Sequence, residues 1–192
     1  MLHFTPGPGA EPVQAPHLPN LSGCRIRPLV EGDADAFRDH LLRLDERSRR
    51  LRFGAPVNDD FIRAYAGRSE SVRRVGLFDG DVLRGVAELH LHTTKPKFAE
   101  GAFSLEVSHR GLGHGTRLFD ALLFEAEGAG VKRLDLQCLR ENVAMQRIAR
   151  RFSARLTFEG SETVATIDLP PAALATVGDW PARLPPVSSE LA

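Results

Sequence analysis

The sequence predicts one mixed α/β domain, from three observations. Alternating apolar and polar residues predict strands, and apolar residues at every third or fourth position predict helices. Asp79-Gly80-Asp81 is a strong hairpin turn between two such strands. A glycine-rich run over 110–116 then separates a strand from a helix. We expect strands at 24–27, 72–78, 82–92, 101–107, 133–139, 154–159 and 163–169, and helices after Asp33, Asn58, Gly115 and Asn142.

Length and composition limit the kind of protein. The chain has 192 residues, of which 42% are hydrophobic, enough for one domain with a proper core. The 25 basic and 25 acidic residues balance, which argues against a dedicated nucleic-acid binder. No apolar run approaches ~20 residues, and the N-terminus has no signal-like apolar stretch. We therefore expect no membrane partner and a cytoplasmic location.

The two cysteines, Cys24 and Cys138, lie in apolar strand-like contexts. Buried free thiols in a reducing compartment are the expected state. No spacing of cysteine and histidine residues resembles a metal site, so no metal is expected.

Proline content divides the chain into three parts. Residues 1–20 are expected to form a proline-rich arm, residues 21–169 the domain, and residues 170–192 a proline-rich tail. In that tail Trp180 is expected to anchor the segment onto the body of the protein.

The run Arg110-Gly111-Leu112-Gly113-His114-Gly115-Thr116 is the most informative motif. Its glycines allow a sharp turn and leave no Cβ to block a ligand. A glycine turn that opens a helix points several free N–H groups, and the positive end of the helix dipole, at one place. The run therefore predicts a phosphate or pyrophosphate site, with a tight strand–helix turn as the alternative.

Three classes of glycine loop were compared. A P-loop needs a lysine after its glycines, and none is present. A dinucleotide-binding loop needs a glycine where Thr116 stands, and the preceding strand comes too late in the chain. The pattern Arg/Gln-x-x-Gly-x-Gly/Ala is satisfied by Arg110, Gly113 and Gly115. It resembles the pyrophosphate loop of the acetyl-CoA-dependent GNAT N-acetyltransferases, and the order of elements over roughly 23–169 is similar to that family.

The resemblance implies a GNAT fold, with a six- to seven-stranded, mixed, mostly antiparallel central sheet and about four helices. It also implies acetyl-CoA as co-substrate, and acetyl transfer to an amine by direct attack in a ternary complex. Neither cysteine lies beside the loop or a histidine, which argues against an acyl-cysteine intermediate. The implied cofactor-binding residues are Leu105, Glu106, Val107, Arg110, Gly111, Leu112, Gly113, His114, Gly115, Thr116 and Asn142.

Each group has an implied role. The amides from Leu112 to Thr116 would hold the pyrophosphate, with Arg110 adding charge. The main chain of 105–107 would bond the pantetheine arm, and an amide near Leu105 would stabilise the oxyanion. A plain buried strand is the alternative for these three residues. Asn142 would cap a helix and contact the cofactor near its sulfur.

Glu100 is the candidate general base, because it lies ten residues before Arg110, close to the base glutamate of several family members. The alternative is a solvated strand carboxylate. Glu106 is the rival base, followed by Glu88 and His90. Many family members place a tyrosine seven residues after the equivalent of Asn142, where this chain has Ala149; the general acid is therefore unassigned, and water could serve.

The basic run over 47–53 has three readings. It could bind nucleic acid, or it could be a helix end whose charges complement the dipole. Ser48-Arg49-Arg50-Leu51-Arg52-Phe53 also resembles a region of GNAT domains related to protein-lysine acetyltransferases. This resemblance favours a primary amine acceptor, either a small molecule or a protein lysine.

Other functions are compatible with the sequence. A degenerate GNAT domain could bind acyl-CoA as a sensor or interaction module without turnover. The enzyme could use a longer acyl chain, or the loop could belong to an NAD-binding module. The hairpin strands and proline-rich ends are also compatible with a homodimer.

Overall fold

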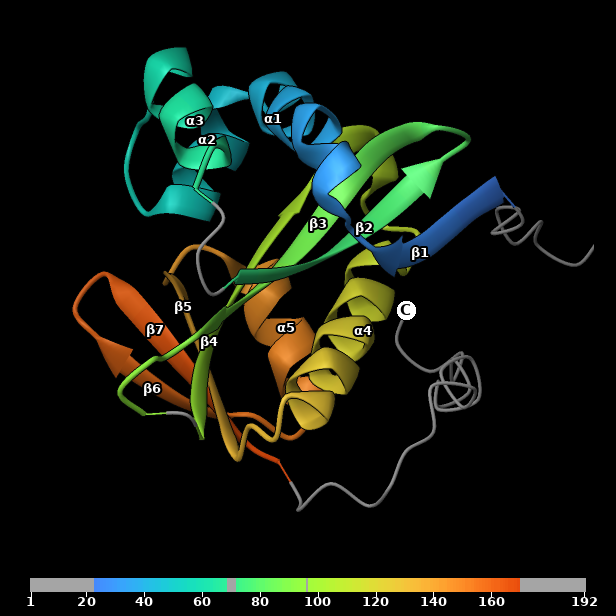
Figure 1. Ribbon diagram of the computed structural model, residues 1–192. Coiled ribbons are helices and arrows are strands. Elements are labelled where there is room, and N and C mark those ends of the chain that lie inside the picture. The colour runs from blue at the N-terminus through green and yellow to red at the C-terminus, as the bar shows by residue number, and fades with distance from the viewer. Residues whose placement is uncertain (1–22, 69–71, 96, 170–192) are drawn as a thin grey trace, which may run out of the picture.

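The computed structural model describes residues 23–68, 72–95 and 97–169 of the 192-residue chain (Figure 1). The expected N-terminal arm, C-terminal tail and Trp180 anchor lie outside these residues and stay predictions.

A seven-stranded sheet forms the centre of the domain, with strand order β1-β2-β3-β4-β5-β7-β6. All neighbouring pairs are antiparallel except β4 and β5, which are parallel. The predicted mixed, mostly antiparallel sheet is therefore confirmed. The strands are β1 (Cys24–Pro28), β2 (Val72–Asp79), β3 (Val82–Leu91), β4 (Phe98–Leu105), β5 (Arg133–Leu139), β6 (Arg155–Glu159) and β7 (Glu162–Asp168).

Five α-helices cover the two faces of the sheet (Figure 1). On one face lie α4 (His114–Gly128) and α5 (Val143–Arg151); on the other lie α1 (Ala34–Arg43), α2 (Glu46–Phe53) and α3 (Asp59–Ala66). Short 3-10 turns, η2 (Glu31–Asp33) and η3 (Val107–His109), precede α1 and follow β4. In the part of the chain that the structure describes, no helix has the length and apolar character needed to cross a membrane.

The structure has one α-helix more than the four expected from the sequence. The additional helix is α2, which contains the basic run over 47–53. Asp45 caps it by accepting a hydrogen bond from the Ser48 N–H at 2.6 Å. Gly54 ends it in the left-handed conformation, with φ of 75°. The run is therefore a short, separately capped helix.

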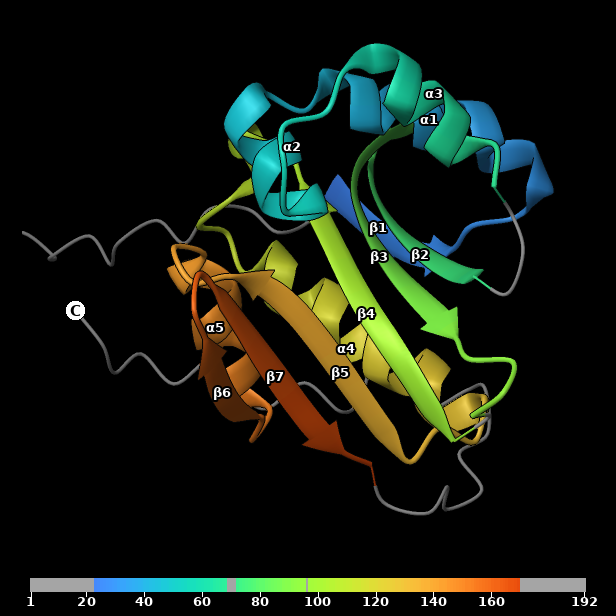
Figure 2. The same ribbon diagram turned by 90° about the vertical axis from the view of Figure 1, so that its left-hand side faces the viewer.

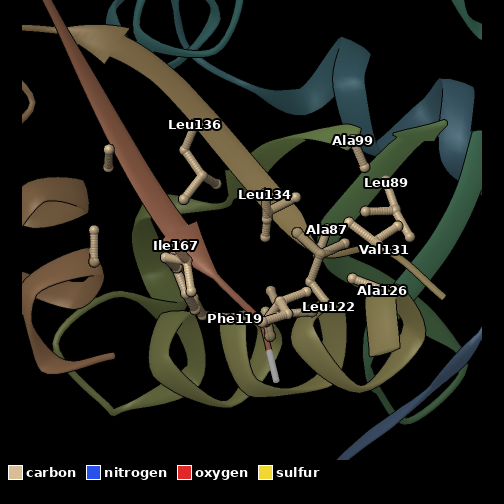
Figure 3. Packing of buried hydrophobic residues seen from close by; sticks show 14 of the residues in the cluster. Ala87, Leu89, Ala99, Phe119, Leu122, Ala126, Val131, Leu134, Leu136 and Ile167 are labelled. Carbon is tan, nitrogen blue, oxygen red and sulfur yellow. The ribbon is translucent and has the colours of Figure 1, made fainter. Parts of the chain in front are cut away.

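The main core lies between the sheet and α4 (Figure 3). Phe119 on α4 stacks on Phe103 of β4, with ring centroids 5.2 Å apart, and on Phe152 at 4.7 Å. The labelled side chains in Figure 3 point into the space between strands and helix; they are Ala87, Leu89, Ala99, Phe119, Leu122, Ala126, Val131, Leu134, Leu136 and Ile167. A smaller cluster that includes Phe37, Leu41 and Ile62 packs α1 and α3 on the opposite face.

β4 and β5 are paired over only three residues each, 98–100 with 133–135. Beyond these pairs the two strands diverge, as Figure 2 shows, toward the end of the sheet beside α2. The divergence opens a gap inside a sheet that is otherwise continuous.

Hydrogen bonds to β3 define which way the backbone of β4 faces. The His92 N–H donates to the Phe98 carbonyl at 3.4 Å, and the Glu106 N–H donates to the Arg84 carbonyl at 3.0 Å. Residues of a strand alternate between its two neighbours, so the even-numbered residues of β4 bond with β3. Phe103 and Leu105 therefore turn their amides toward the gap.

Gly101 offers a test of the packing between β4 and α4. A Cβ at this position would lie 2.7 Å from Leu136 Cδ2 and 2.9 Å from Leu122 Cδ2. We expect Gly101→Ala to lower the free energy of unfolding by about 1–3 kcal/mol, because the added methyl group would overpack the core. Urea denaturation measures the difference. Gly128→Ala is the control, since a Cβ there meets nothing within 4 Å; it should be neutral or stabilising. A Gly101→Ala protein as stable as wild type would contradict this packing.

Candidate active site

The glycine loop between η3 and α4 has the backbone expected of an anion site. Gly111 and Gly113 have φ of 74° and 78°, in the left-handed region that favours glycine. Gly113 is the N-cap of α4, and the first bond of this turn runs from the Arg117 N–H to the Gly113 carbonyl at 3.1 Å. Within the described ranges, the amides of residues 112–116 donate to no backbone carbonyl. Five donors and the helix dipole are thus available to one anionic ligand.

Of residues 112–116, Gly113, Gly115 and Thr116 line a cleft of about 410 Å³, which we call the cofactor cleft; Leu112 and His114 are not part of its lining. It runs from the glycine loop along the end of β4 and reaches α2 on one side and α5 on the other. A Cβ on Gly115 would lie 3.0 Å from Ile148 Cδ1, so glycine permits the close approach of α4 to α5. The cleft is lined by Leu44, Ser48, Leu51, Arg52, Phe103, Ser104, Leu105, Arg110, Gly111, Gly113, Gly115, Thr116, Leu118, Asn142, Ala144, Met145, Arg147 and Ile148.

Arg110 borders the cleft, but its guanidinium is engaged in the protein. Nε and Nη2 donate to the Leu105 carbonyl at 3.1 and 2.9 Å, and Nη2 also donates to Ser48 Oγ at 2.7 Å. The side chain thereby ties the end of β4 to α2. Its charge lies beside the loop, while its hydrogen bonds are structural.

Asn142 caps α5, as the sequence predicts, by accepting a hydrogen bond from the Met145 N–H at 3.2 Å. It also lines the cofactor cleft. Ala149, on the same helix, is 1% exposed and carries no group that could donate a proton.

Of residues 105–107, Leu105 presents its amide to the cleft. The Glu106 amide is already bonded to Arg84, and the Glu106 carbonyl accepts from the His109 N–H at 3.0 Å. The Val107 carbonyl accepts from the Arg110 N–H at 3.1 Å. The expected pantetheine contact is therefore available at the Leu105 amide but not at the Glu106 amide.

Two arginines and one histidine donate hydrogen bonds to the Glu106 carboxylate. It lies 2.9 Å from Arg43 Nε, 2.9 Å from Arg84 Nη1 and 3.3 Å from His40 Nδ1. Burial opposes its ionisation, but the hydrogen bonds from His40, Arg84 and Arg43 outweigh burial and lower its pKa to about 2. A carboxylate so stabilised is a poor base, so Glu106 is a structural anchor and not a competitor of Glu100.

His40 links Glu106 to Ser104, which lines the cofactor cleft. Its Nε2 lies 2.9 Å from Ser104 Oγ, and its ring is completely buried. Burial lowers the pKa of His40 despite the neighbouring Glu106 carboxylate, which favours the neutral ring.

Glu100 lies in a second cavity of about 350 Å³, on β4 near the point where the strands diverge; we call it the acceptor pocket. Its side chain is 63% exposed, and one carboxylate oxygen is 3.2 Å from His92 Nε2. The pocket is lined by Leu51, Arg52, Phe53, Gly54, Tyr65, His90, Glu100, Gly101, Ala102, Gln137, Cys138, Leu139 and Glu162. Glu100 thus has the access to solvent that Glu106 lacks.

Glu88, another alternative base, is buried with no exposed surface. It pairs with Arg52, with Arg74 Nε at 3.2 Å, and accepts from Tyr65 Oη at 3.0 Å. Burial opposes its ionisation, yet Arg52 and Arg74 outweigh burial and lower its pKa. His90, beside it, has a pKa lowered by burial. Sequence analysis missed this network, because its members are far apart along the chain; the basic run that forms α2 was the one signal.

Neither cysteine is set up as a nucleophile. Cys138 lines the acceptor pocket, and Cys24 lies in β1; both are free. Burial raises the pKa of both thiols, which keeps them protonated. Among the described residues no cluster of three or more His, Cys, Asp or Glu side chains could hold a metal ion.

Two parallel strands diverge beside a helix N-terminus that glycines open, which makes a site suited to an extended ligand with an anionic group. The model of the Acetyltransferase (GNAT) family matches residues 38–153, more than half of the chain, and the protein belongs to this family. Acetyl-CoA is accordingly the co-substrate, and the free loop amides and the Leu105 amide fit its pyrophosphate and pantetheine parts.

A short segment also matches a curated protein. It is 36% identical over 74 residues to the acetyltransferase Pat of Mycolicibacterium smegmatis, covering 38% of this chain and 22% of that protein. The chain thus spans about a fifth of that relative's length.

Solved structures share the fold. The GNAT domain of S. lividans PAT superposes with a TM-score of 0.66 at 18% identity, covering 76% of this chain and 90% of that one. The acetyltransferase yncA of Salmonella typhimurium, solved with acetyl-CoA, has a TM-score of 0.58 at 15% identity, covering 81% and 99%.

The ion pairs of Glu106 predict that its contribution to the free energy of unfolding depends on pH. Because the carboxyl pKa falls from its usual 4.5 to about 2, the stabilisation is present above pH 4.5 and is lost as the pH falls toward 2. We expect Glu106→Gln to lower the free energy of unfolding by about 3 kcal/mol at pH 7, and by progressively less below pH 4.5. Denaturant titrations across this pH range measure the difference. Glu141→Gln removes only a half-exposed pair with Arg50 and should have little effect; equal effects of both substitutions would contradict the assignment.

The glycine loop predicts specific stabilisation by acetyl-CoA. At about 100 times its Kd, a ligand adds roughly 2.7 kcal/mol to stability, which a thermal melt detects as a rise in Tm. Gly113→Asp should abolish this rise, because the side chain is strained at positive φ and its charge repels the pyrophosphate.

Gly130→Asp is the matched control. Gly130 also has φ of 74° and open space around it, and it does not line the cofactor cleft. The rise should survive in this variant, and NAD should give none. A rise that survives in Gly113→Asp would show that the loop does not bind the cofactor.

Proposed function

We propose that the protein transfers an acetyl group from acetyl-CoA to a primary amine by direct attack in a ternary complex. One observation carries this proposal: the cofactor cleft and the acceptor pocket share Leu51 and Arg52 of α2, and consecutive residues of β4 line them, 103–105 the cleft and 100–102 the pocket. A thioester in the first cavity and an amine in the second would meet there without a covalent enzyme intermediate.

The chain binds the cofactor mainly through its backbone. The amides of residues 112–116 and the N-terminus of α4 hold the pyrophosphate. The Leu105 amide faces the cleft and donates to the acyl carbonyl oxygen as negative charge develops there. Asn142 contacts the cofactor near its sulfur while capping α5. When bound, acetyl-CoA supplies an acyl group activated by its thioester.

Glu100 acts as the general base. Its exposed carboxylate lies in the acceptor pocket and takes a proton from the acceptor ammonium, directly or through one water. The free amine then attacks the acyl carbon. Glu106 and Glu88 cannot replace it, because their arginine partners lower their pKa values and so make it unfavourable for them to accept a proton.

Water protonates the leaving thiolate. Burial raises the pKa of Tyr65 to about 12, and its hydroxyl is bonded to Arg52 and Glu88, so it is a poor proton donor. A thiolate with a pKa near ~8.5 leaves without full protonation. The alanine at position 149 is consistent with this arrangement.

The acceptor pocket suits a primary amine that is positively charged in solution. Glu100 and Glu162 contribute carboxylates to its lining, and the pocket is open to solvent. A lysine side chain of a protein is our favoured acceptor, supported by the similarity of residues 48–53 to GNAT domains related to protein-lysine acetyltransferases. We place this reaction in the cytoplasm, where acetyl-CoA and reduced thiols occur together.

Glu100→Gln tests the mechanism. We expect kcat to fall by about 10²- to 10⁴-fold, as is usual on loss of a general base, with little change in KM for acetyl-CoA. Release of free CoA thiol in the presence of a panel of amines and lysine peptides measures both constants. Glu159→Gln, on the exposed strand β6, is the control and should behave as wild type.

The same assay separates transfer from binding alone. If acetyl-CoA stabilises the protein but no amine in the panel is acetylated, the domain is a CoA-binding sensor and the transferase proposal fails. Turnover that Glu100→Gln does not slow would leave the transfer intact and remove Glu100 as the base.

A further inference from the structure

Arg52 on α2 occupies the junction of the two cavities. Among the described residues, Arg52 and its neighbour Leu51 are the two that line both the cofactor cleft and the acceptor pocket. In a direct transfer, the acyl carbon must lie where thioester and amine meet. Arg52 is therefore the one cationic side chain of the described residues that borders both cavities.

One donor of Arg52 has no partner. Only 8% of the side chain is exposed, and its Nε–H is buried without a hydrogen bond in the described part of the chain. Leaving a buried donor unpaired is energetically costly, so such groups call for an explanation. Arg84 Nε and His114 Nδ1 also lack partners, but neither residue lines either cavity.

The rest of the guanidinium is held in one place. Nη2 donates to Tyr65 Oη at 2.7 Å and to the Glu88 carboxylate, and the group lies over the rings of Phe53 and Tyr65, 4.8 and 5.4 Å from their centroids. Glu88 is completely buried and is held from its other oxygen by Arg74. Binding a ligand would therefore require no rearrangement of Arg52, which is the condition for electrostatic stabilisation of a transition state.

We propose that Arg52 is a catalytic residue whose Nε–H donates to the carbonyl oxygen of the acyl group. When the amine attacks the acyl carbon, the carbonyl π electrons move to this oxygen, and Arg52 and the Leu105 amide stabilise the resulting oxyanion. The oxyanion then collapses, the C–S bond breaks, and the thiolate leaves and takes a proton from water. The nitrogen loses its second proton to water, because Glu100 already holds the first. A charge-assisted donor is stronger than a neutral one, so its contribution grows as the oxygen becomes negative. This inference rests on the proposed function.

The test observes the carbonyl without needing an acceptor. Acetyl-CoA labelled with ¹³C at the thioester carbonyl is bound to the protein, and its ¹³C resonance is compared with that of the free cofactor. A hydrogen bond from a fixed cation polarises the carbonyl and moves the resonance downfield. In Arg52→Met we expect the resonance to return toward its free position, with Kd for acetyl-CoA almost unchanged.

Arg74→Met is the matched control. This substitution also removes a guanidinium that pairs with Glu88, but Arg74 lines neither cavity. Its bound resonance should remain downfield. In the amine assay, Arg52→Met should lower kcat by about 10²- to 10³-fold, the usual effect of losing one oxyanion donor.

If Arg52→Met does not fold, as judged by thermal melting, Arg52→Lys keeps a cation opposite Glu88 and removes the Nε–H; the same loss of the downfield shift is expected. A bound wild-type resonance with no downfield shift, or one that persists in the folded Arg52 variant, would overturn the inference. Failure of the wild-type protein to bind acetyl-CoA at all would instead overturn the proposed function.

Discussion

The parallel hydrogen bonding between β4 and β5 stops after three residue pairs, and most functional features of the domain depend on this. In a fully paired sheet, the amides of Phe103 and Leu105 would bond with β5, and no ligand could reach them. With the strands apart, these amides require another acceptor, because unpaired backbone groups are costly when water is excluded. An extended, amide-containing ligand such as pantetheine can supply that acceptor.

Two buried carboxylates, Glu106 and Glu88, hold α1 and α2 against the strands beside the divergence of β4 and β5. Glu106 ties α1 to the end of β4 through His40 and Arg43, and Glu88 ties α2 to β3 through Arg52. Apolar packing alone defines the distance between a helix and a sheet, but it permits sliding. Ion pairs that are shielded from solvent also define the register of the helix along the strands. Because α2 borders both cavities, its position determines how a thioester and an amine would face each other.

The sequence was sufficient to predict the fold class because its signals are local. Strand alternation, the Asp79-Gly80-Asp81 turn and the glycine loop each lie within a few neighbouring residues, and the loop pointed to the family. The roles of Glu106 and Arg52 were not predictable in this way. The partners of Glu106 are 22 to 66 positions away along the chain, and those of Arg52 are 13 and 36 positions away. Only the folded arrangement shows that Glu106 is engaged while Glu100 is accessible, and the role of Glu100 itself stays a prediction.

The short pairing of β4 with β5 also has a mechanical consequence. The sheet consists of a four-stranded half, β1–β4, and a three-stranded half, β5–β7, and their backbones are hydrogen-bonded to each other over those three residue pairs. This seam is the weakest line in the sheet, and α4 bridges it by packing against strands from both halves (Figure 3). A ligand lying along the gap acts as a substitute strand that restores continuity between the halves. We therefore expect a ligand in the cleft to make the two halves of the domain unfold more cooperatively.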